Sequence, residues 1–140
     1  MANIVPDSFK QELFLATHNF STTSGNTFKL ALYTTVSGFS TGTTNYITTN
    51  EASGTGYSAG GTTLVNSTVT VAQNISFVSF SNATFSTATL TASCCLIYNS
   101  TQSNKAVVVL DFGGSKTSTN GDFTIQFPAA NSTSAVLRIS

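Results

Sequence analysis

The sequence predicts an all-β protein: an antiparallel β-sandwich, jelly-roll or Ig-like, with one short N-terminal α-helix. After Thr27, apolar and polar residues alternate with a period of two in six or seven short segments separated by turn signals. The only helical pattern precedes these segments, and the helices that βαβ units would need between strands are missing. A length of 140 residues suits one ordinary domain, so we expect residues 1–140 to form a single sandwich.

The helix is expected over residues 8–18. Ser8 followed by Gln11 fits a capping box, and Phe9, Leu13 and Ala16 recur at the spacing of one helix face. His18 and the polar residues after it end the pattern, and a histidine at this place is expected to bind the last helix carbonyls.

The first strand is expected over residues 28–33, with Phe28, Leu30 and Leu32 on one face. A long segment rich in Gly, Ser and Thr follows over residues 36–63. Extended segments without regular structure are uncommon in compact domains and tend to be functional. We therefore expect this segment to have a role of its own.

Strand patterns resume at residues 64–71 and 75–80, and alternation is strongest over 87–98. There the even-numbered residues from Ala88 to Tyr98 are expected to share one face. The adjacent Cys94 and Cys95 then point to opposite faces, so they cannot bridge each other. Each is expected to be buried as a small apolar side chain.

Three further strand patterns complete the sandwich. After a hairpin loop at 99–104, residues 105–112 form a nearly continuous apolar run, which predicts a central strand covered on both faces. Residues 122–127 follow the Asn120-Gly121 turn signal, with Phe123, Ile125 and Phe127 expected to point inward. Residues 135–139 form the last strand.

The charge of the chain excludes some function classes. Charged residues make up 7% of the sequence and the net charge is zero, so the clustered Lys and Arg of a nucleic-acid binder are missing. We expect no membrane partner, because no apolar run approaches the length of a membrane span. The N-terminus lacks the pattern of a signal peptide, which predicts synthesis in a cytoplasm with reduced cysteines.

No motif in the sequence predicts catalysis, a cofactor or a metal. The glycine-rich run at 53–61 lacks the lysine and the following helix of a phosphate-binding loop. A single histidine gives no specific evidence for a catalytic triad. The two cysteines have no further Cys or His cluster to complete a metal site. We therefore expect that the protein is not an enzyme.

Four segments together resemble a family of small virion structural proteins of tailed bacteriophages. They span nearly the whole chain in family order, and the Gly-Tyr-Ser-Ala-Gly-Gly element within the second is the most specific. The segments are residues 8–20 leading into 28–34, residues 50–64, residues 92–101 with Leu-Ile-Tyr-Asn at their core, and residues 109–114 with Leu-Asp-Phe-Gly-Gly followed by residues 121–129, Gly-Asp-Phe-Thr-Ile-Gln-Phe-Pro-Ala.

The resemblance implies a virion protein that is made in the host cytoplasm, and a capsid decoration or cement protein that binds and stabilises the head exterior. Its partners would be the major capsid protein or other virion proteins, and a homo-oligomer such as a trimer is expected. The alternative is a tail or fibre-associated adhesin or receptor-binding module, in which tyrosines would stack on sugars. The candidate contact residues are Phe9, Tyr46, Glu51, Gly54, Gly56, Tyr57, Gly60 and Gly61.

Overall fold

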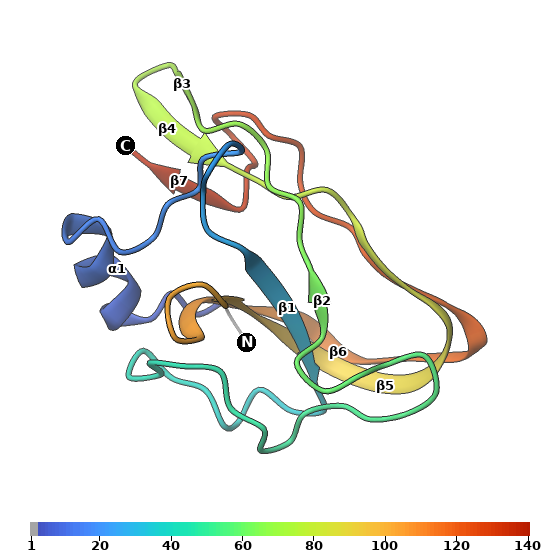
Figure 1. Cartoon of the computed structure of the whole chain (residues 1–140). Helices are drawn as coiled ribbons and strands as arrows, with labels where there is room; N and C mark the ends of the chain where they lie inside the picture. Colours follow the sequence, from blue (N-terminus) through green and yellow to red (C-terminus); the bar gives the residue numbers. More distant parts are fainter. Residues whose placement is uncertain (1–2) are drawn as a thin grey trace.

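The computed structural model describes residues 3–140 and contains two antiparallel sheets and one short helix (Figure 1). The main sheet has the strand order β2-β1-β5-β6 and the small sheet the order β3-β4-β7. The elements are α1 (Asp7–Phe14), β1 (Phe28–Tyr33), β2 (Thr62–Thr63), β3 (Thr70–Ala72), β4 (Ile75–Val78), β5 (Ala83–Asn99), β6 (Lys105–Ile125) and β7 (Leu137–Ile139). The predicted all-β sandwich with one short N-terminal helix is confirmed.

Strands β5 and β6 form one long hairpin that contributes to both layers of the sandwich. It closes through the predicted loop after Asn99 and stays paired as far as Ala83 and Ile125. The ribbon bends back at the right of Figure 1, so its far half lies over the main sheet. Several register shifts along β5 mark β-bulges, which bend a strand and increase its twist.

The predicted alternation along 87–98 is wrong beyond Ala92. Between the pairs Ala92–Lys116 and Cys94–Asp111 the register shifts by three residues, with the extra residues on β6, and the side chains of β5 exchange faces at this irregularity. The face toward the interlayer core is taken by Ala88, Leu90 and Ala92 and then by Cys95 and Ile97, while Cys94, Leu96 and Tyr98 lie on the opposite face. The two cysteines are free, buried and on opposite faces, as predicted.

The prediction of a central strand at 105–112 is also wrong, since β6 lies at the edge of the main sheet and runs on without a break to Ile125. Its first residues are nevertheless covered on both faces. The edge is protected by other segments: Ile4 exchanges backbone hydrogen bonds of 2.9 and 2.8 Å with Val109, and the Ala106 N–H donates to the Thr44 carbonyl at 2.9 Å. Non-strand segments therefore do what neighbouring strands would do.

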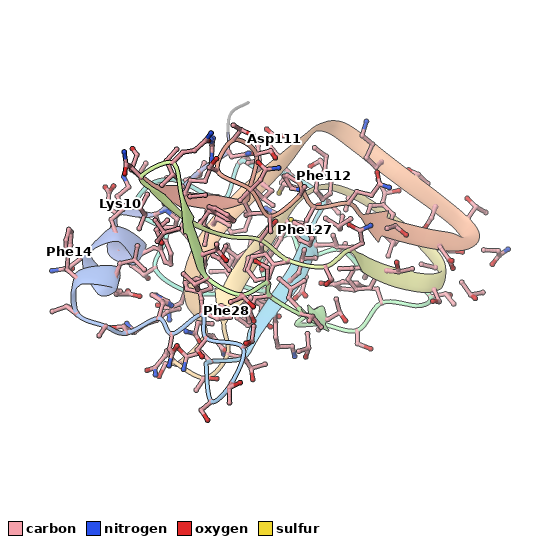
Figure 2. All side chains as sticks on the ribbon, turned by 90° about the horizontal axis from the view of Figure 1, so that it is seen from above. Lys10, Phe14, Phe28, Asp111, Phe112 and Phe127 are labelled. Atoms are coloured by element: carbon pink, nitrogen blue, oxygen red, sulfur yellow. The ribbon has the colours of Figure 1, made fainter. Side chains whose placement is uncertain are left out.

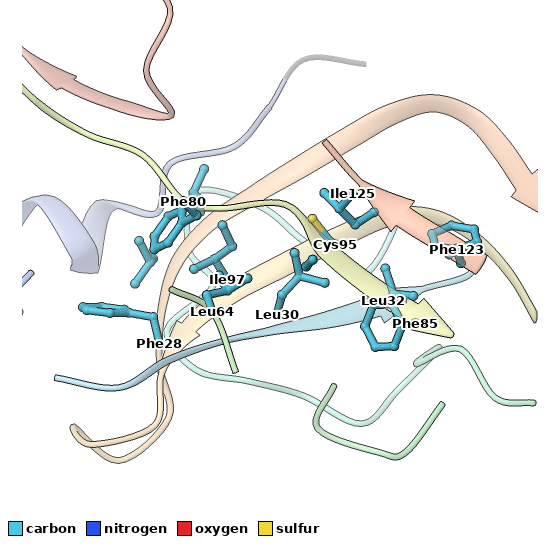
Figure 3. Close-up of a cluster of buried hydrophobic side chains, with 14 of the residues drawn as sticks. Phe28, Leu30, Leu32, Leu64, Phe80, Phe85, Cys95, Ile97, Phe123 and Ile125 are labelled. Atoms are coloured by element: carbon cyan, nitrogen blue, oxygen red, sulfur yellow. The ribbon is translucent and has the colours of Figure 1, made fainter. Parts of the chain in front are cut away.

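Two apolar clusters lie on the two faces of the main sheet. The interlayer core contains the predicted inward residues of β1 and the far ends of β5 and β6 (Figure 3). The second cluster lies on the other face, where Phe39, Tyr46 and Ile47 pack over β1 and β5. We call residues 36–61 the cover segment, because this part of the long segment closes the second face. The long segment, for which we expected a role of its own, thus has a structural role: it covers this face of the main sheet.

The helix is shorter than predicted and begins differently. It spans Asp7–Phe14 after Pro6, and no side chain caps it. The capping box is wrong because the Ser8 hydroxyl donates to the Thr43 carbonyl at 3.3 Å, so the cover segment takes the group that would have capped the helix. The chain leaves the helix at Ala16, which has a positive φ of 57°.

The small sheet is assembled from shorter strands than the patterns predicted. Residues 64–71 contribute only the end of this range to β3, and β7 is confined to Leu137–Ile139. Gln73 and Asn74 both have positive φ, 54° and 64°, as a two-residue hairpin turn between β3 and β4 requires.

The far end of β6 confirms the predicted inward side of Phe123, Ile125 and Phe127. Phe123 and Ile125 are buried in the interlayer core, and Phe127, which follows the strand, is partly buried and packs against the same core, with its ring 5.5 Å from that of Phe80. The Asn120-Gly121 pair is no hairpin turn: it lies inside β6, where Gly121 pairs with Ala88. The positive φ of Asn120, 47°, is part of the bend of the ribbon.

Candidate protein-interaction surface

The glycine-rich part of the cover segment is organised by one carboxylate. Glu51 accepts hydrogen bonds from the hydroxyls of Tyr46 and Tyr57, both at 2.6 Å, and from the Gly60 N–H at 2.7 Å. The Ala52 N–H bonds to the Leu32 carbonyl at 2.8 Å, which places Glu51 beside the end of β1. Four of the predicted contact residues are thus brought together, and they bind each other.

Both tyrosines act as hydrogen-bond donors here. Burial, followed by the hydrogen bond to the Glu51 carboxylate, raises the pKa of Tyr46 and of Tyr57 well above the ordinary value. The Tyr57 hydroxyl also accepts the Leu32 N–H at 3.0 Å, so this side chain links Glu51 to the main sheet.

The aromatic faces of these tyrosines are used within the molecule. The Tyr46 ring stacks on Tyr98 with centroids 4.9 Å apart, and the Tyr57 ring packs at 5.3 Å from Phe85. The Tyr98 hydroxyl donates to the Gly60 carbonyl at 2.6 Å and so holds the loop a second time. Each tyrosine ring thus has an aromatic partner within the chain and is only partly exposed.

The glycines allow the loop to lie directly on strands of its own chain. A Cβ at Gly54 would meet the Thr89 carbonyl, and one at Gly61 would meet the Leu30 carbonyl. Both have positive φ, 148° and 76°, which favours glycine. Gly56, with φ of 80°, lies against Ala88 with less overlap, since a Cβ there would come within 2.9 Å of the Ala88 Cα. These glycines, predicted as contacts for a partner, thus lie against β1 and β5 of their own chain.

The outer side of the loop is exposed and uncharged. Ser53, Thr55, Ser58 and Ala59 are exposed between the glycines, while Glu51 and Tyr57 below them are only partly so. The loop is held by the three bonds to Glu51 and by the Thr89 N–H, which donates to the Thr55 carbonyl at 2.9 Å. A partner would meet a backbone that is already held in place, so little backbone conformational entropy would be lost on binding.

Phe9, the remaining predicted contact residue, lies in the interlayer core with an exposed fraction of 3%. Its ring packs 4.9 Å from the His18 ring and 6.3 Å from that of Phe20. It anchors α1 on the sandwich, and it cannot touch a partner without unfolding of this end.

The prediction that His18 binds the last helix carbonyls is wrong. The side chain lies buried in a polar network instead. Its Nε2 is 2.6 Å from the Glu12 carboxylate, and the Asn99 amide donates to Nδ1 at 3.0 Å. Lys105 Nζ lies 3.5 Å from the other Glu12 oxygen. Burial lowers the pKa of His18 below its ordinary 6.5, although Glu12 acts to raise it. Both ring nitrogens are occupied by structural partners.

Sequence reasoning missed an apolar surface around α1. Phe14 and Leu15 are exposed by 94% and 67%, and Figure 2 shows Phe14 at the outer side of the helix. A groove of about 1180 Å³ lies beside them, between α1 with the residues after it and the small sheet. One signal was available: Phe14 falls off the apolar helix face formed by Phe9, Leu13 and Ala16.

A signal for the Glu51 cluster was available as well. Glu51 is the only charged residue between Lys29 and Lys105, in a region that contributes β1, β5 and most of both clusters. A lone carboxylate among hydroxyl, amide and glycine residues indicates an acceptor for several donors.

Comparison of the chain with protein-family models, with curated proteins and with solved structures found no match. Among residues 3–140, no three His, Cys, Asp or Glu side chains come together in a group that could hold a metal ion. Within the same residues, no helix is long and apolar enough to cross a bilayer.

Proposed function

We propose that this protein is a virion structural protein of a tailed bacteriophage, and that it binds and stabilises the capsid exterior as a decoration protein. Two kinds of observation support the proposal. The four sequence segments resemble such virion proteins, and the second of them, residues 50–64, includes the loop that Glu51 organises.

The observation that carries the proposal is the preorganised, uncharged outer face of the loop at 53–59. Its backbone is held from below, and its exposed backbone and hydroxyl groups form hydrogen bonds without carrying charge. Such a face suits close packing against a protein lattice, where salt neither drives nor prevents the contact. Binding to the assembled shell adds its free energy to shell stability by mass action, because dissociated capsomers do not present the same site.

The experiment compares virions that lack this protein with the same virions after purified protein is added back. We expect the deficient heads to break at lower temperature and under milder osmotic shock, and added protein to restore both. Labelled protein should bind heads, and its binding should change little between low and high salt. Heads that resist heat and shock equally well with and without the protein would contradict the decoration role.

A matched pair of variants tests the surface. Ser58→Lys puts bulk and charge on the outer face of the loop, and Ser115→Lys makes the same change at an exposed position of β6. We expect the first to abolish binding to heads and the second to leave it unchanged. Equal binding by both variants would exclude the loop as the contact. Binding of labelled protein to tails alone would favour the tail or fibre module instead.

A further inference from the structure

A buried polar network joins α1 and the residues after it to the hairpin loop at 99–104. The His18 ring lies at its centre, with Nε2 2.6 Å from the Glu12 carboxylate, and Asn99 Nδ2 donates to Nδ1 at 3.0 Å. The same Nδ2 donates to the Asn26 Oδ1 at 2.8 Å. Glu12, His18 and Asn99 are all buried. We call these four side chains the latch, because they connect the N-terminal residues to the hairpin loop.

The backbone fixes the orientation of the Asn99 amide. Its Oδ1 accepts from the N–H groups of Thr101 and Gln102 at 3.1 and 3.2 Å. A backbone N–H can only donate, so the oxygen must face these two groups and Nδ2 must face Asn26 and His18. Both hydrogens of the amide are then used. The group that meets His18 Nδ1 is therefore a donor.

The neutral His18 ring carries its proton on Nε2. Nδ1 accepts from Asn99 and so has no hydrogen of its own, while Nε2 donates to the Glu12 carboxylate. A second proton has to go to Nδ1, where its N–H would meet the N–H of Asn99. Turning the amide over would remove this conflict but would present NH₂ to the N–H groups of Thr101 and Gln102. No orientation of Asn99 satisfies both a doubly protonated ring and the hairpin loop.

Two charged groups of residues 3–140 face the ring. The Glu12 carboxylate, on α1, favours the protonated form, whereas Lys105, the first residue of β6, has its Nζ 3.5 Å from the other Glu12 oxygen and opposes it. β1 contributes the apolar ring of Phe28, and β5 contributes Asn99. Burial outweighs Glu12 and lowers the pKa of His18, and the Asn99 donor acts in the same direction. The closed latch thus disfavours the charged ring.

We propose that the latch is acid-sensitive: a proton taken from solvent by Nδ1 separates His18 from Asn99 and releases residues 15–26 from the hairpin loop. The pairing of β5 with β6 extends over both strands and does not depend on the latch, so we expect it to persist and the opening to be local. The opening also exposes the face of Phe20 that stacks on Phe28. The latch is independent of the proposed function, since none of its residues belongs to the loop at 53–59.

Amide hydrogen exchange measured by NMR between about pH 7.5 and about pH 5, corrected for the effect of pH on the chemical rate, tests the latch. The reporters are the N–H groups of Asn19 and Asn26, which are bonded within the segment. We expect their opening constant to increase about tenfold for each pH unit below 6.5, because the open segment binds one more proton at a histidine of ordinary pKa. Residues 94–98 of β5 should keep their protection.

His18→Gln is the matched control. A glutamine amide can donate to Glu12 and accept from Asn99, but it does not titrate, so opening of the segment should not change with pH in this variant. Equal acid opening in the wild type and in this variant would overturn the proposal. Loss of protection in residues 94–98 at the same pH would do so as well, because the opening would then be global.

Nitrogen-15 NMR of the wild-type ring tests the geometry without a substitution. At neutral pH we expect His18 Nε2 to be protonated and Nδ1 to be bare, and on acidification Nδ1 should gain its proton in step with the exchange of Asn19 and Asn26. A proton on Nδ1 at neutral pH would contradict the assignment. A ring that becomes charged while the two amides stay protected would show that the closed latch accepts the imidazolium, and the proposal would be wrong.

Discussion

Removing the Glu51 carboxylate should cost the protein much of its stability. In Glu51→Ala, the hydroxyls of Tyr46 and Tyr57 and the Gly60 N–H lose their common acceptor. A hydrogen bond to a charged group contributes about 1.5–3 kcal/mol. Three such bonds give an upper figure, and water can reach Tyr46 once the carboxylate is gone. We therefore expect a loss of about 3–5 kcal/mol, against a total of about 5–15 kcal/mol for a domain.

Glu51→Gln is the matched control. Its carbonyl oxygen can still accept from Tyr57 and Gly60, and its amide group can donate to the Tyr46 hydroxyl. Only the charge is lost, so we expect a decrease of about 1–2 kcal/mol. Urea unfolding gives both values as shifts in the transition midpoint at constant slope. A loss below about 1 kcal/mol in the alanine variant, or equal losses in both variants, would refute the role of the carboxylate as organiser of the loop.

Three further predictions concern buried or strained positions. The pKa of His18 is lower in the folded chain than its unfolded value of 6.5, so its contribution to stability is complete above pH 6.5 and decreases as the pH falls below that value. The thermal midpoint, measured as a function of pH, should show this decrease, and the pH dependence should be smaller in His18→Gln. Burial raises the pKa of Cys94 to about 11 and that of Cys95 further, so neither thiol should react with a disulfide reagent at pH 8 until the chain unfolds; rapid labelling of the native protein would contradict this. Gly61 and Gly113 have the same φ of 76°, but only Gly61 lies against a neighbouring backbone. Urea unfolding should therefore show a loss of about 1–3 kcal/mol in the free energy of unfolding for Gly113→Ala and a clearly larger loss for Gly61→Ala.

Local patterns predicted most strands because alternation and turn residues act within a few positions. β1 has the predicted bounds and face, and the hairpin after Asn99 lies where its turn residues indicated. The faces along β5 could not be read in this way, because a bulge changes the pairing partner without changing the alternation in the sequence. The edge position of β6 was hidden for a similar reason: its apolar run is covered by the cover segment and the residues around Ile4.

The candidate site shows the same division. The sequence indicated the segment, through its length and glycines, and it placed Tyr46, Glu51 and Tyr57 among the candidate contacts. The hydrogen bonds among these three residues could not be predicted, because the periodicity of the sequence carries no information on which side chains meet in the folded chain. Phe9 was a candidate contact because of its place in the N-terminal segment, yet it belongs to the core. The exposed large apolar residue of that helix is Phe14.

The cover segment protects one face of the main sheet while being only loosely joined to its hydrogen-bond ladder. Apart from single bridges, its backbone is attached by turns and side chains, so it can open as a unit at a lower free energy than the hairpin of β5 and β6. Amide hydrogens of residues 36–61 should then exchange with deuterium sooner than those of Leu96 and its neighbours. A partner bound to the outer face of the loop would have to be released before each opening. Slower exchange across the whole segment would therefore report occupancy of that face, even for a partner that touches only a few of its residues.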